Sequence, residues 1–246
     1  MQSDAYDEMI ALQGTHWWFV ARRRIIRMVA AKYLPVGTGK VLEVGCGVGG
    51  NVVVLSKFGK YVGLDIHAPA IEYCIKSHPG KMFINSSIED IQKVKEIEKY
   101  NSIFILDVLE HLDRDVESLR RLGKLLDDGG KFLITVPAFQ FLWSTHDEFV
   151  HHKRRYTKKN LINTLHSAGL EIERISYFNT FLFPLAFIQR TMLKLLNRTS
   201  KTHLNQPPKF ANAILQFIFS LEVPVLRKLS LPVGLSLFAV CHKKEV

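Results

Sequence analysis

Cysteine is scarce in this 246-residue chain, and its three cysteines (Cys46, Cys74 and Cys241) form no CxxC pair. An odd number in no metal-binding spacing argues against a disulfide scaffold or a zinc ribbon and fits a reducing compartment. The pattern of a signal peptide is also missing, because three acidic residues stand among the first eight, before any apolar run. These absences predict a cytoplasmic protein.

Acidic side chains are scarce in the C-terminal part of the chain. Residues 151–246 hold 15 Lys and Arg but only 4 Asp and Glu, whereas residues 1–150 hold 18 Lys and Arg and 19 Asp and Glu. The net charge of +10 therefore arises in the C-terminal part, where we expect an anionic partner: a membrane surface, a phosphorylated substrate or nucleic acid. A solvated basic face is the alternative. The apolar content of 47% excludes disordered and low-complexity classes.

The chain has no uninterrupted apolar run of the length that a membrane-spanning helix needs, about 20 residues. Phe178–Leu196 and Phe210–Leu226 are the densest apolar stretches, and polar, charged or proline residues interrupt both. Such stretches suit an interfacial helix, a lid or a dimer face better than a membrane span.

Between residues 40 and 136, short apolar runs alternate with helix-length segments. We expect strands over Lys40–Val44, Tyr61–Asp65, Met82–Asn85, Ser102–Asp107, Gly130–Val136, Glu171–Phe178 and Leu235–Cys241. We expect helices over Val48–Phe58, Ala68–Ser77, Ile88–Ile97, Val116–Leu126 and Lys158–Ala168. Strands that alternate with helices predict βαβ units on a parallel sheet, that is, an α/β fold.

A glycine-rich turn follows the first expected strand, in the string VLEVGCGVGG of residues 41–50. Glycines permit a tight turn and close approach of the backbone to a ligand, and a helix N-terminus offers free N–H groups. Asp65 ends the next strand, where a carboxylate can accept both hydroxyls of a ribose. The string fits both the dinucleotide pattern GxGxxG and the pattern ExGxGxG, so by itself it leaves the ligand open.

Three further blocks decide between these patterns. Ser87–Asp90 follows the third expected strand, Asp107–Leu112 (DVLEHL) follows the fourth, and Leu125–Gly130 (LLDDGG) precedes the fifth. The order and spacing of all four blocks resemble the class I methyltransferases that use S-adenosylmethionine. A short-chain dehydrogenase would need Tyr-x-x-x-Lys, and no tyrosine of this chain has a lysine four places on.

The resemblance implies a Rossmann-like sheet of seven strands with helices on both faces, and S-adenosylmethionine as the cofactor. The motif glycines would lie against its methionyl part, Asp65 would hold its ribose, and Asp107 would lie near its amine. Two isoleucines would enclose the adenine, and a glutamate would contact the adenine amino group. The implied cofactor-binding residues are Glu43, Gly45, Gly47, Gly49, Asp65, Ile66, Ile88, Glu89 and Asp107. For Asp107 the alternative is a helix-start charge that interacts with the helix dipole.

The flanks resemble a narrower subgroup of methyltransferases, which accompany glycosyltransferases in surface-polysaccharide and lipid-glycan pathways. The resemblance is carried by HWWF at residues 16–19, HKRRY at 152–156 and LPVGLSL at 231–237, although His151 stands where the subgroup often has glycine. The extent of the class I resemblance predicts a methyltransferase core over 40–178 and 233–246, preceded by an N-terminal helical cap over 1–39. A helical, apolar and basic insertion over 179–232, before the last strand, would contact substrate, membrane or a second subunit.

The loop Pro137–Tyr156 is expected at the carboxyl edge of the sheet, where open α/β sheets bind ligands. Methyl transfer to a hydroxyl needs a general base, and histidine titrates near neutral pH. We expect His146 to be this base, oriented by Asp147, with His152 second and His111 third. The alternative is a polar surface loop.

The neighbouring cations Arg154 and Arg155, with Tyr156, are candidates for binding a phosphorylated or lipid-pyrophosphate substrate, because arginine forks suit phosphate. A salt bridge inside the fold is the alternative. No residue is assigned to a metal in the preferred interpretation. Asp107, Glu110 and His111 nevertheless resemble the metal-binding acid-x-x-Glu-His of ubiquinone-pathway O-methyltransferases, which leaves a divalent ion such as Mg²⁺ as an alternative.

The sequence thus predicts an S-adenosylmethionine-dependent methyltransferase that methylates an oxygen of a sugar, a lipid-linked glycan or another small molecule. It would work in the cytoplasm at the inner face of an anionic membrane, with a homodimer as a further expectation. An RNA methyltransferase is one alternative, although the Asn/Asp-Pro-Pro-Tyr/Phe tetrad of many base N-methyltransferases is absent. A non-catalytic partner protein that keeps the fold is the other.

Overall fold

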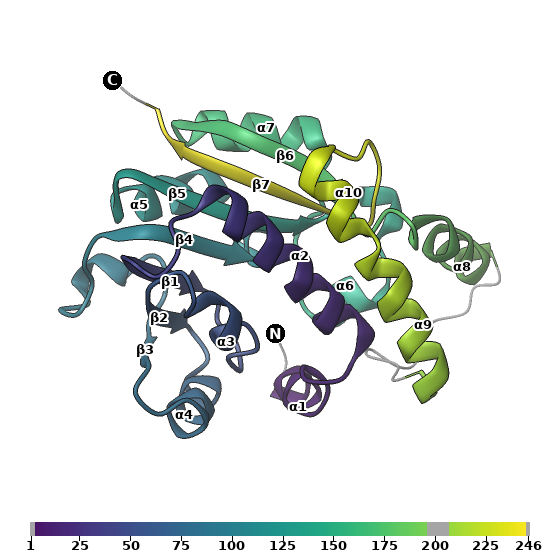
Figure 1. Cartoon of the computed structure of the whole chain (residues 1–246), viewed down its shortest axis with the longest axis horizontal. Helices are drawn as coiled ribbons and strands as arrows, with labels where there is room; N and C mark the ends of the chain where they lie inside the picture. Colours follow the sequence, from purple (N-terminus) through teal and green to yellow (C-terminus); the bar gives the residue numbers. More distant parts are fainter. Residues whose placement is uncertain (1–2, 196–206, 245–246) are drawn as a thin grey trace.

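Seven strands form one mixed sheet in the computed structural model, which describes residues 3–195 and 207–244 (Figure 1). The strand order is β3-β2-β1-β4-β5-β7-β6, and only β7 runs antiparallel to its neighbours. The strands are β1 (Lys40–Val44), β2 (Lys60–Asp65), β3 (Met82–Asn85), β4 (Tyr100–Leu106), β5 (Leu126–Pro137), β6 (Leu170–Phe178) and β7 (Ser236–Lys243). The expected Rossmann-like methyltransferase sheet is confirmed. Its strand order reverses between β1 and β4, the place where open α/β sheets bind ligands.

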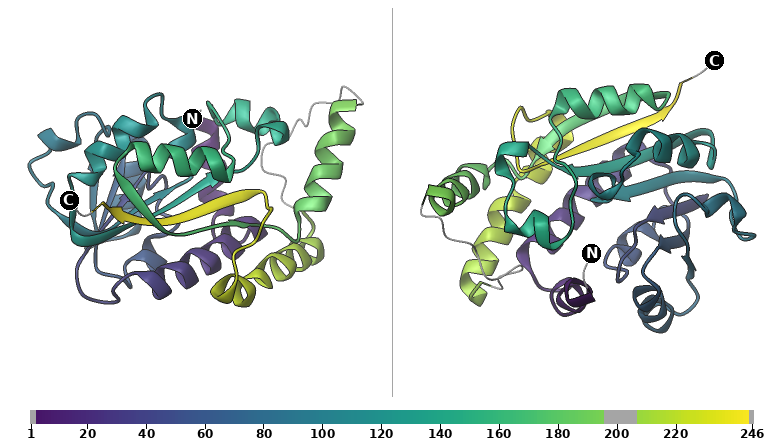
Figure 2. Two further views of the ribbon diagram at one scale, coloured as in Figure 1. Left: turned by 90° about the horizontal axis from the view of Figure 1, so that it is seen from above. Right: turned by 180° about the vertical axis from the view of Figure 1, so that it is seen from behind.

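Helices cover both faces of this sheet because side chains alternate along each buried strand (Figures 1 and 2). In β1, Val41 packs on one face, whereas Leu42 and Val44 pack on the other. The first face is covered by α2 (Trp17–Tyr33), α3 (Val52–Leu55), α9 (Lys209–Ser220) and α10 (Glu222–Lys228). The second is covered by α5 (Asp115–Gly123) and α7 (Lys158–Ser167), while α4 (Ala68–Ser77) packs along β2 and β3.

Two expected helices are much shorter than predicted. Instead of a helix over Val48–Phe58, only α3 forms, because two glycines and three consecutive valines weaken the helix at its start. Instead of a helix over Ile88–Ile97, only the 3₁₀ turn η1 (Ile91–Lys93) forms. The Ser87 hydroxyl accepts the backbone N–H of Asp90 at 3.1 Å, a capping hydrogen bond just before this turn.

The N-terminal residues form two helices, of which α1 and the first turn of α2 lie near the carboxyl ends of the strands, while the rest of α2 runs along one face of the sheet (Figure 1). In α1 (Ser3–Leu12), Tyr6 packs with Val48 of the glycine-rich turn and with Ala70 of α4. The long helix α2 begins at Trp17 and buries one side against the sheet. Residues far apart in sequence therefore cover the site where the glycine-rich turn lies.

The expected insertion contains α8 (Phe183–Leu195), α9 and α10, and its residues 196–206, including the Leu196 end of the first apolar stretch, lie outside the described part. Buried Glu222 accepts backbone N–H groups of Asn179 at 2.7 Å and Phe181 at 2.8 Å, which ties α10 to the end of β6. Contrary to the sequence expectation, Lys209–Lys228 is long and apolar enough to cross a membrane, by length and composition only. In this fold α9 and α10 instead pack along α2.

Candidate active site

The glycine-rich turn between β1 and α3 forms one wall of the site. Gly45 and Gly47 have positive φ angles of 70° and 52°, a backbone region that favours glycine. A Cβ atom at Gly45 would lie 2.3 Å from Val108, so this position has no room for a side chain. The N–H of Gly47 donates to the Asp65 carboxylate at 2.8 Å, which joins the turn to the end of β2.

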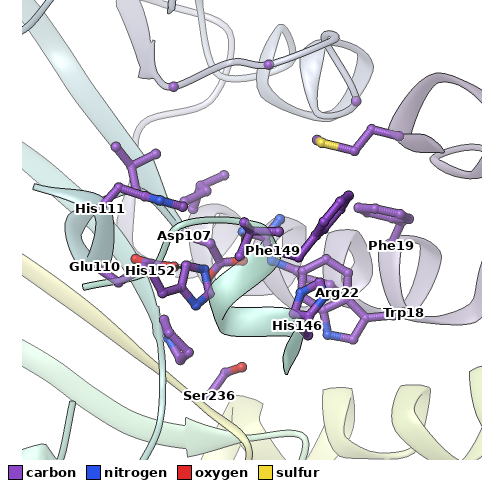
Figure 3. A pocket seen from close by; sticks show the side chains of 18 of the residues that line it. Trp18, Phe19, Arg22, Asp107, Glu110, His111, His146, Phe149, His152 and Ser236 are labelled. Atoms are coloured by element: carbon purple, nitrogen blue, oxygen red, sulfur yellow. Dashed lines mark ion pairs between the residues drawn. The ribbon is translucent and has the colours of Figure 1, made fainter. Parts of the chain in front are cut away.

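A cavity of about 1220 Å³ opens from this turn along the carboxyl ends of the strands. It exceeds the roughly 300–1,000 Å³ of an ordinary small-molecule site, so it has room for a cofactor and an acceptor together. Its lining comes from α1, α2, the glycine-rich turn, the loops after β2, β3, β4 and β5, and from α8. Figure 3 shows Trp18, Asp107 and His152 around one part of this cavity.

The sequence-predicted cofactor residues fall into two groups. Gly45, Gly47, Asp65, Ile66, Ile88, Glu89 and Asp107 line the cavity. Asp65 is buried, and it accepts the His67 N–H at 2.9 Å and the Tyr6 hydroxyl at 3.5 Å, so its oxygens face the cavity with acceptor capacity to spare. This arrangement fits the ribose of an adenosyl group.

Glu43 and Gly49 are not in contact with the cavity. Glu43 is fully buried beneath the turn, where it accepts Asn51 at 2.7 Å and the Tyr61 hydroxyl at 2.5 Å. Burial raises the pKa of Glu43 to about 7. A Cβ atom at Gly49 would meet His78 and Cys74, so this glycine allows close packing against α4. Both residues support the turn from outside the cavity, and direct cofactor contact stays a prediction.

Asp107 follows β4 with a φ angle of 58°, which is unusual for a residue other than glycine and is typical of functional sites. Its Oδ2 pairs with Arg22 of α2 at 2.6 Å, and its Oδ1 accepts the Thr135 hydroxyl at 3.0 Å. Arg22 is nearly inaccessible and also contacts Thr135. The sequence pattern singled out Asp107, but not the Arg22 partner that holds it.

Arg23 is the next residue of α2 and also lines the cavity. It donates to the backbone carbonyl of Gln13, and among the described residues it forms no salt bridge with a carboxylate. Burial and the neighbouring Arg22 lower its pKa. Arg23 is therefore the cation of α2 that can hold the carboxylate of a methionyl group.

Asp147 orients His152, whereas the sequence predicted that it would orient His146. Asp147 Oδ1 lies 2.8 Å from His152 Nδ1, and Arg155 contacts both carboxylate oxygens at 2.7 and 3.0 Å. The backbone and hydroxyl of Ser144 complete this shell, and these contacts hold the pKa of Asp147 well below its usual range despite its burial. With Nδ1–H held by the carboxylate, Nε2 of His152 is the nitrogen that can accept a proton.

The other two candidate bases lie beside His152. The rings of His111 and His146 lie 4.7 and 6.3 Å from the His152 ring, and all three line the cavity (Figure 3). Burial lowers the pKa of both His111 and His146 to about 4. His146 Nδ1 is buried and has no hydrogen-bond partner among the described residues, whereas the Nδ1 of His111 lies 3.3 Å from a backbone carbonyl. Neither has the carboxylate partner that His152 has.

The expected substrate cations have partners inside the fold. Arg154 and Tyr156 both bind the Asp115 carboxylate, at 3.1 and 2.8 Å, and neither lines the cavity. Arg155 reaches the cavity wall, but its guanidinium contacts Asp147 and the Ala138 carbonyl. This geometry corresponds to the alternative of salt bridges inside the fold, because the arginine forks already have acceptors. A substrate role for these residues stays a prediction.

One group among the described residues could hold a metal ion: Glu110, His111 and His152, whose ligand atoms lie within 4.8 Å of one another. Glu110 is completely buried, and neither of its carboxylate oxygens has a hydrogen bond. Burial and the nearby Asp107 raise its pKa well above the usual range. The metal alternative in the sequence analysis paired Glu110 and His111 with Asp107, but Asp107 pairs with Arg22 and His152 takes its place.

Comparison with known proteins decides the family. The family model described as a methyltransferase domain matches residues 14–175, more than half of the chain. This chain belongs to that methyltransferase family. The match includes the glycine-rich turn, Asp65, Asp107 and the Asp147–His152 pair, so the family assignment and the cavity concern the same residues. S-adenosylmethionine is the cofactor, and Gly45, Gly47 and Asp65 provide the cradle that it fits.

Two curated relatives are ubiquinone biosynthesis O-methyltransferases. The mitochondrial one from Dictyostelium discoideum is 28% identical over 124 residues, which cover 45% of this chain and 39% of the relative. The one from Xanthomonas axonopodis pv. citri is 24% identical over 169 residues, which cover 61% of this chain and 70% of the relative. The match thus spans about two fifths of the first relative. A SAM-dependent methyltransferase from Archaeoglobus fulgidus shares the fold, with a TM-score of 0.56, 18% identity and coverage of 90% and 94%.

Proposed function

We propose that this methyltransferase transfers a methyl group to a hydroxyl oxygen of a small-molecule acceptor, with His152 as the general base. The observation that carries the proposal is the Asp147–His152 pair at the cavity wall, with Nδ1 held at 2.8 Å. A hydroxyl must lose its proton as the new bond forms, so a positioned base is the chemistry that an O-methyltransferase needs. The names of the two curated relatives, both O-methyltransferases, support the same reaction class.

S-adenosylmethionine supplies the methyl group on a sulfonium, which leaves as S-adenosylhomocysteine. Asp65 would hold its ribose, the turn at Gly45–Gly47 would lie against its methionyl part, and Arg23 and Asp107 would face the charged methionyl end. His152 takes the hydroxyl proton on Nε2, and Asp147 stabilises the imidazolium that results. The aromatic and apolar side chains of the lining, several of them from α1 and α2, would limit the access of water to the reacting atoms.

For the acceptor, we propose a sugar or a lipid-linked glycan, as the subgroup resemblance in the flanks implies. The outer surface of the insertion supports a lipid-associated acceptor, because α8 and α9 expose large apolar side chains at the same end of the molecule (Figure 2). These are Leu185, Phe187, Ile188, Met192, Phe210, Ile214 and Phe217. We therefore propose peripheral contact with the inner face of an anionic membrane, with a homodimer through the same surface as the alternative.

An RNA methyltransferase is the less favoured function. The cavity is lined largely by aromatic and apolar side chains, and two of its four arginines, Arg22 and Arg155, are paired to carboxylates, whereas single-stranded RNA binding normally uses an open, continuous basic groove. A scaffold without catalysis is also less favoured, because the residues that fit the cofactor and the base are all present in one cavity.

The experiment is a transfer assay with S-adenosylmethionine labelled in its methyl group and a panel of hydroxylated acceptors: free sugars, sugar phosphates, lipid-linked sugars and phenols. Mass spectrometry of the product should show an O-methyl ether. Labelling of RNA alone would overturn the proposal. Calorimetry with S-adenosylmethionine, with NADH as the control, tests the cofactor separately.

A metal held by Glu110, His111 and His152 is a second way to activate the hydroxyl, and the two orphaned carboxylate oxygens of Glu110 favour it. Two imidazoles and one carboxylate suit zinc, iron or manganese better than Mg²⁺. In that case activity would be lost on dialysis against a chelator and restored by one of these ions. If His152 acts as the base, chelation should leave the rate unchanged.

A further inference from the structure

Helix α8 turns a face with polar side chains toward the cavity and exposes apolar side chains on its outer face. Ala186, Gln189 and Arg190 share one face, at i, i+3 and i+4, and this face lines the cavity. Leu185 and Ile188 point away from it, with exposed fractions of 58% and 55%. A helix of a globular protein normally turns its apolar face inward. The inward polar face of α8 therefore suits a polar occupant of the cavity.

Arg190 differs from two of the other cations that line the cavity. Arg22 is paired with Asp107 and Arg155 with Asp147, so the charge of each is balanced. Arg190 donates to the backbone carbonyl of Leu142, and no salt bridge joins it to any described carboxylate. Its guanidinium has five N–H donors, so most of its hydrogen-bonding capacity stays open toward the cavity.

Arg190 lies at the end of the cavity that is away from the cofactor turn. Its contact with Leu142 places it beside the loop that carries His146 and His152, and its positive charge contributes to the lowered pKa of His146. Arg23, the other cation without a carboxylate, contacts Gln13 beside the glycine-rich turn. The cavity thus has one arginine without a carboxylate partner near each end. One can bind the carboxylate of the cofactor, and the other is available for an anionic group on a second molecule.

We propose that Arg190 binds an oxyanion of the acceptor, a phosphate or a carboxylate, and so selects acidic acceptors. The inference rests on the proposed methyl transfer, because it assigns the substrate class of the same cavity. A planar fork with several free N–H groups matches the paired oxygens of either anion. The acceptor hydroxyl would then lie between this anchor and His152.

The test is calorimetric titration of the full chain, saturated with S-adenosylhomocysteine, with pyrophosphate and separately with acetate. Arg190→Gln should weaken oxyanion binding about tenfold or more, as loss of a hydrogen bond to a charged group implies. Arg190→Lys should keep part of the affinity, because it keeps the charge but loses the fork. Arg227→Gln is the matched control, an exposed arginine of the insertion that does not line the cavity.

A second measurement uses the unaltered protein. Phenylglyoxal should modify Arg190, as seen by peptide mass analysis, and pyrophosphate or acetate should protect it. Protection by only one anion would identify the group on the acceptor. The inference would be overturned if neither anion protected Arg190. It would also be overturned if Arg190→Gln lowered the melting temperature but left the oxyanion affinity unchanged, and Arg190 would then have only a structural role through its contact with Leu142. Failure to bind S-adenosylhomocysteine at all would instead count against the proposed function.

Discussion

At the cofactor end of the cavity, most ligand-facing groups come from the carboxyl ends of β1, β2, β3 and β4 and the turns that follow them, and Arg23 comes from α2. At the acceptor end, they come from the loop after β5 and from α8, and the contact of Arg190 with Leu142 joins residues 48 apart in sequence. The first end is made by the turns of the sheet itself, and the second by packing of an added segment. We therefore expect that a substitution at one end will leave ligand binding at the other end nearly intact.

The largest expected effect is at the acceptor end. His152→Ala should lower kcat by about a hundredfold to ten-thousandfold, the usual contribution of a general base, while the affinity for S-adenosylmethionine stays within a factor of two or so. His146→Ala is the matched control and should cost far less, because His146 has no orienting carboxylate. Steady-state kinetics with calorimetry checks both. A larger loss of kcat in His146→Ala than in His152→Ala would show that His146 is the general base, as the sequence predicted.

The next effect is at the cofactor end. Asp65→Ala should weaken the binding of S-adenosylmethionine about tenfold to hundredfold. The variant loses the charged acceptor for the ribose hydroxyls, and the N–H of Gly47 loses its hydrogen-bond partner. Oxyanion binding near Arg190 should be unchanged. Calorimetric titration with each ligand measures the two effects. Equal weakening of both ligands would mean that the two ends are one cooperative unit.

The sequence was sufficient for the cofactor end because its determinants are local. A positive φ at Gly45 and a carboxylate at the end of β2 both follow from a strand, a turn and their spacing. The alternation of strands and helices predicted the parallel βαβ units, and the seven-stranded sheet was expected from the resemblance to class I methyltransferases. Glu43 and Gly49 belong to the same motif but act beneath the turn, a difference that the pattern alone does not encode.

The acceptor end could be predicted only in part, because pairing there depends on tertiary contacts. Five polar residues stand within seven positions of the loop, and sequence order cannot say that Asp147 turns toward His152 and Arg155. Arg190 looked like an interruption in an apolar stretch. Its functional signal is the face of α8 on which it lies, which becomes visible only when the helix is placed on the core.

A smaller effect concerns the outer surface of the insertion. Phe210 and Phe217 of α9 are 79% and 64% exposed, and insertion of such rings into a membrane interface is favourable. Phe210→Ser with Phe217→Ser should weaken binding to phosphatidylglycerol vesicles roughly tenfold in a flotation assay. Val36→Ser, an exposed apolar residue far from α9 in sequence, is the control. A soluble dimer that dissociates in the Phe variant would instead assign this face to a second subunit.

The smallest effect tests the support beneath the cofactor turn through pH. Glu43 is protonated in the folded protein up to a pKa of about 7, whereas the unfolded chain releases this proton near the ordinary value. Its contribution to stability is therefore fully present below about pH 4.5 and is lost as pH rises toward 7. Glu43→Gln cannot ionise, so its melting temperature relative to the unaltered protein should rise by several degrees between pH 5 and 8. Exposed Glu96→Gln should show no such trend in the same thermal scans. If the difference in melting temperature between Glu43→Gln and the unaltered protein does not change with pH, the Glu43 carboxyl is ionised in the folded protein. Hydrogen bonds from Asn51 and Tyr61 would then stabilise a buried carboxylate beneath the turn.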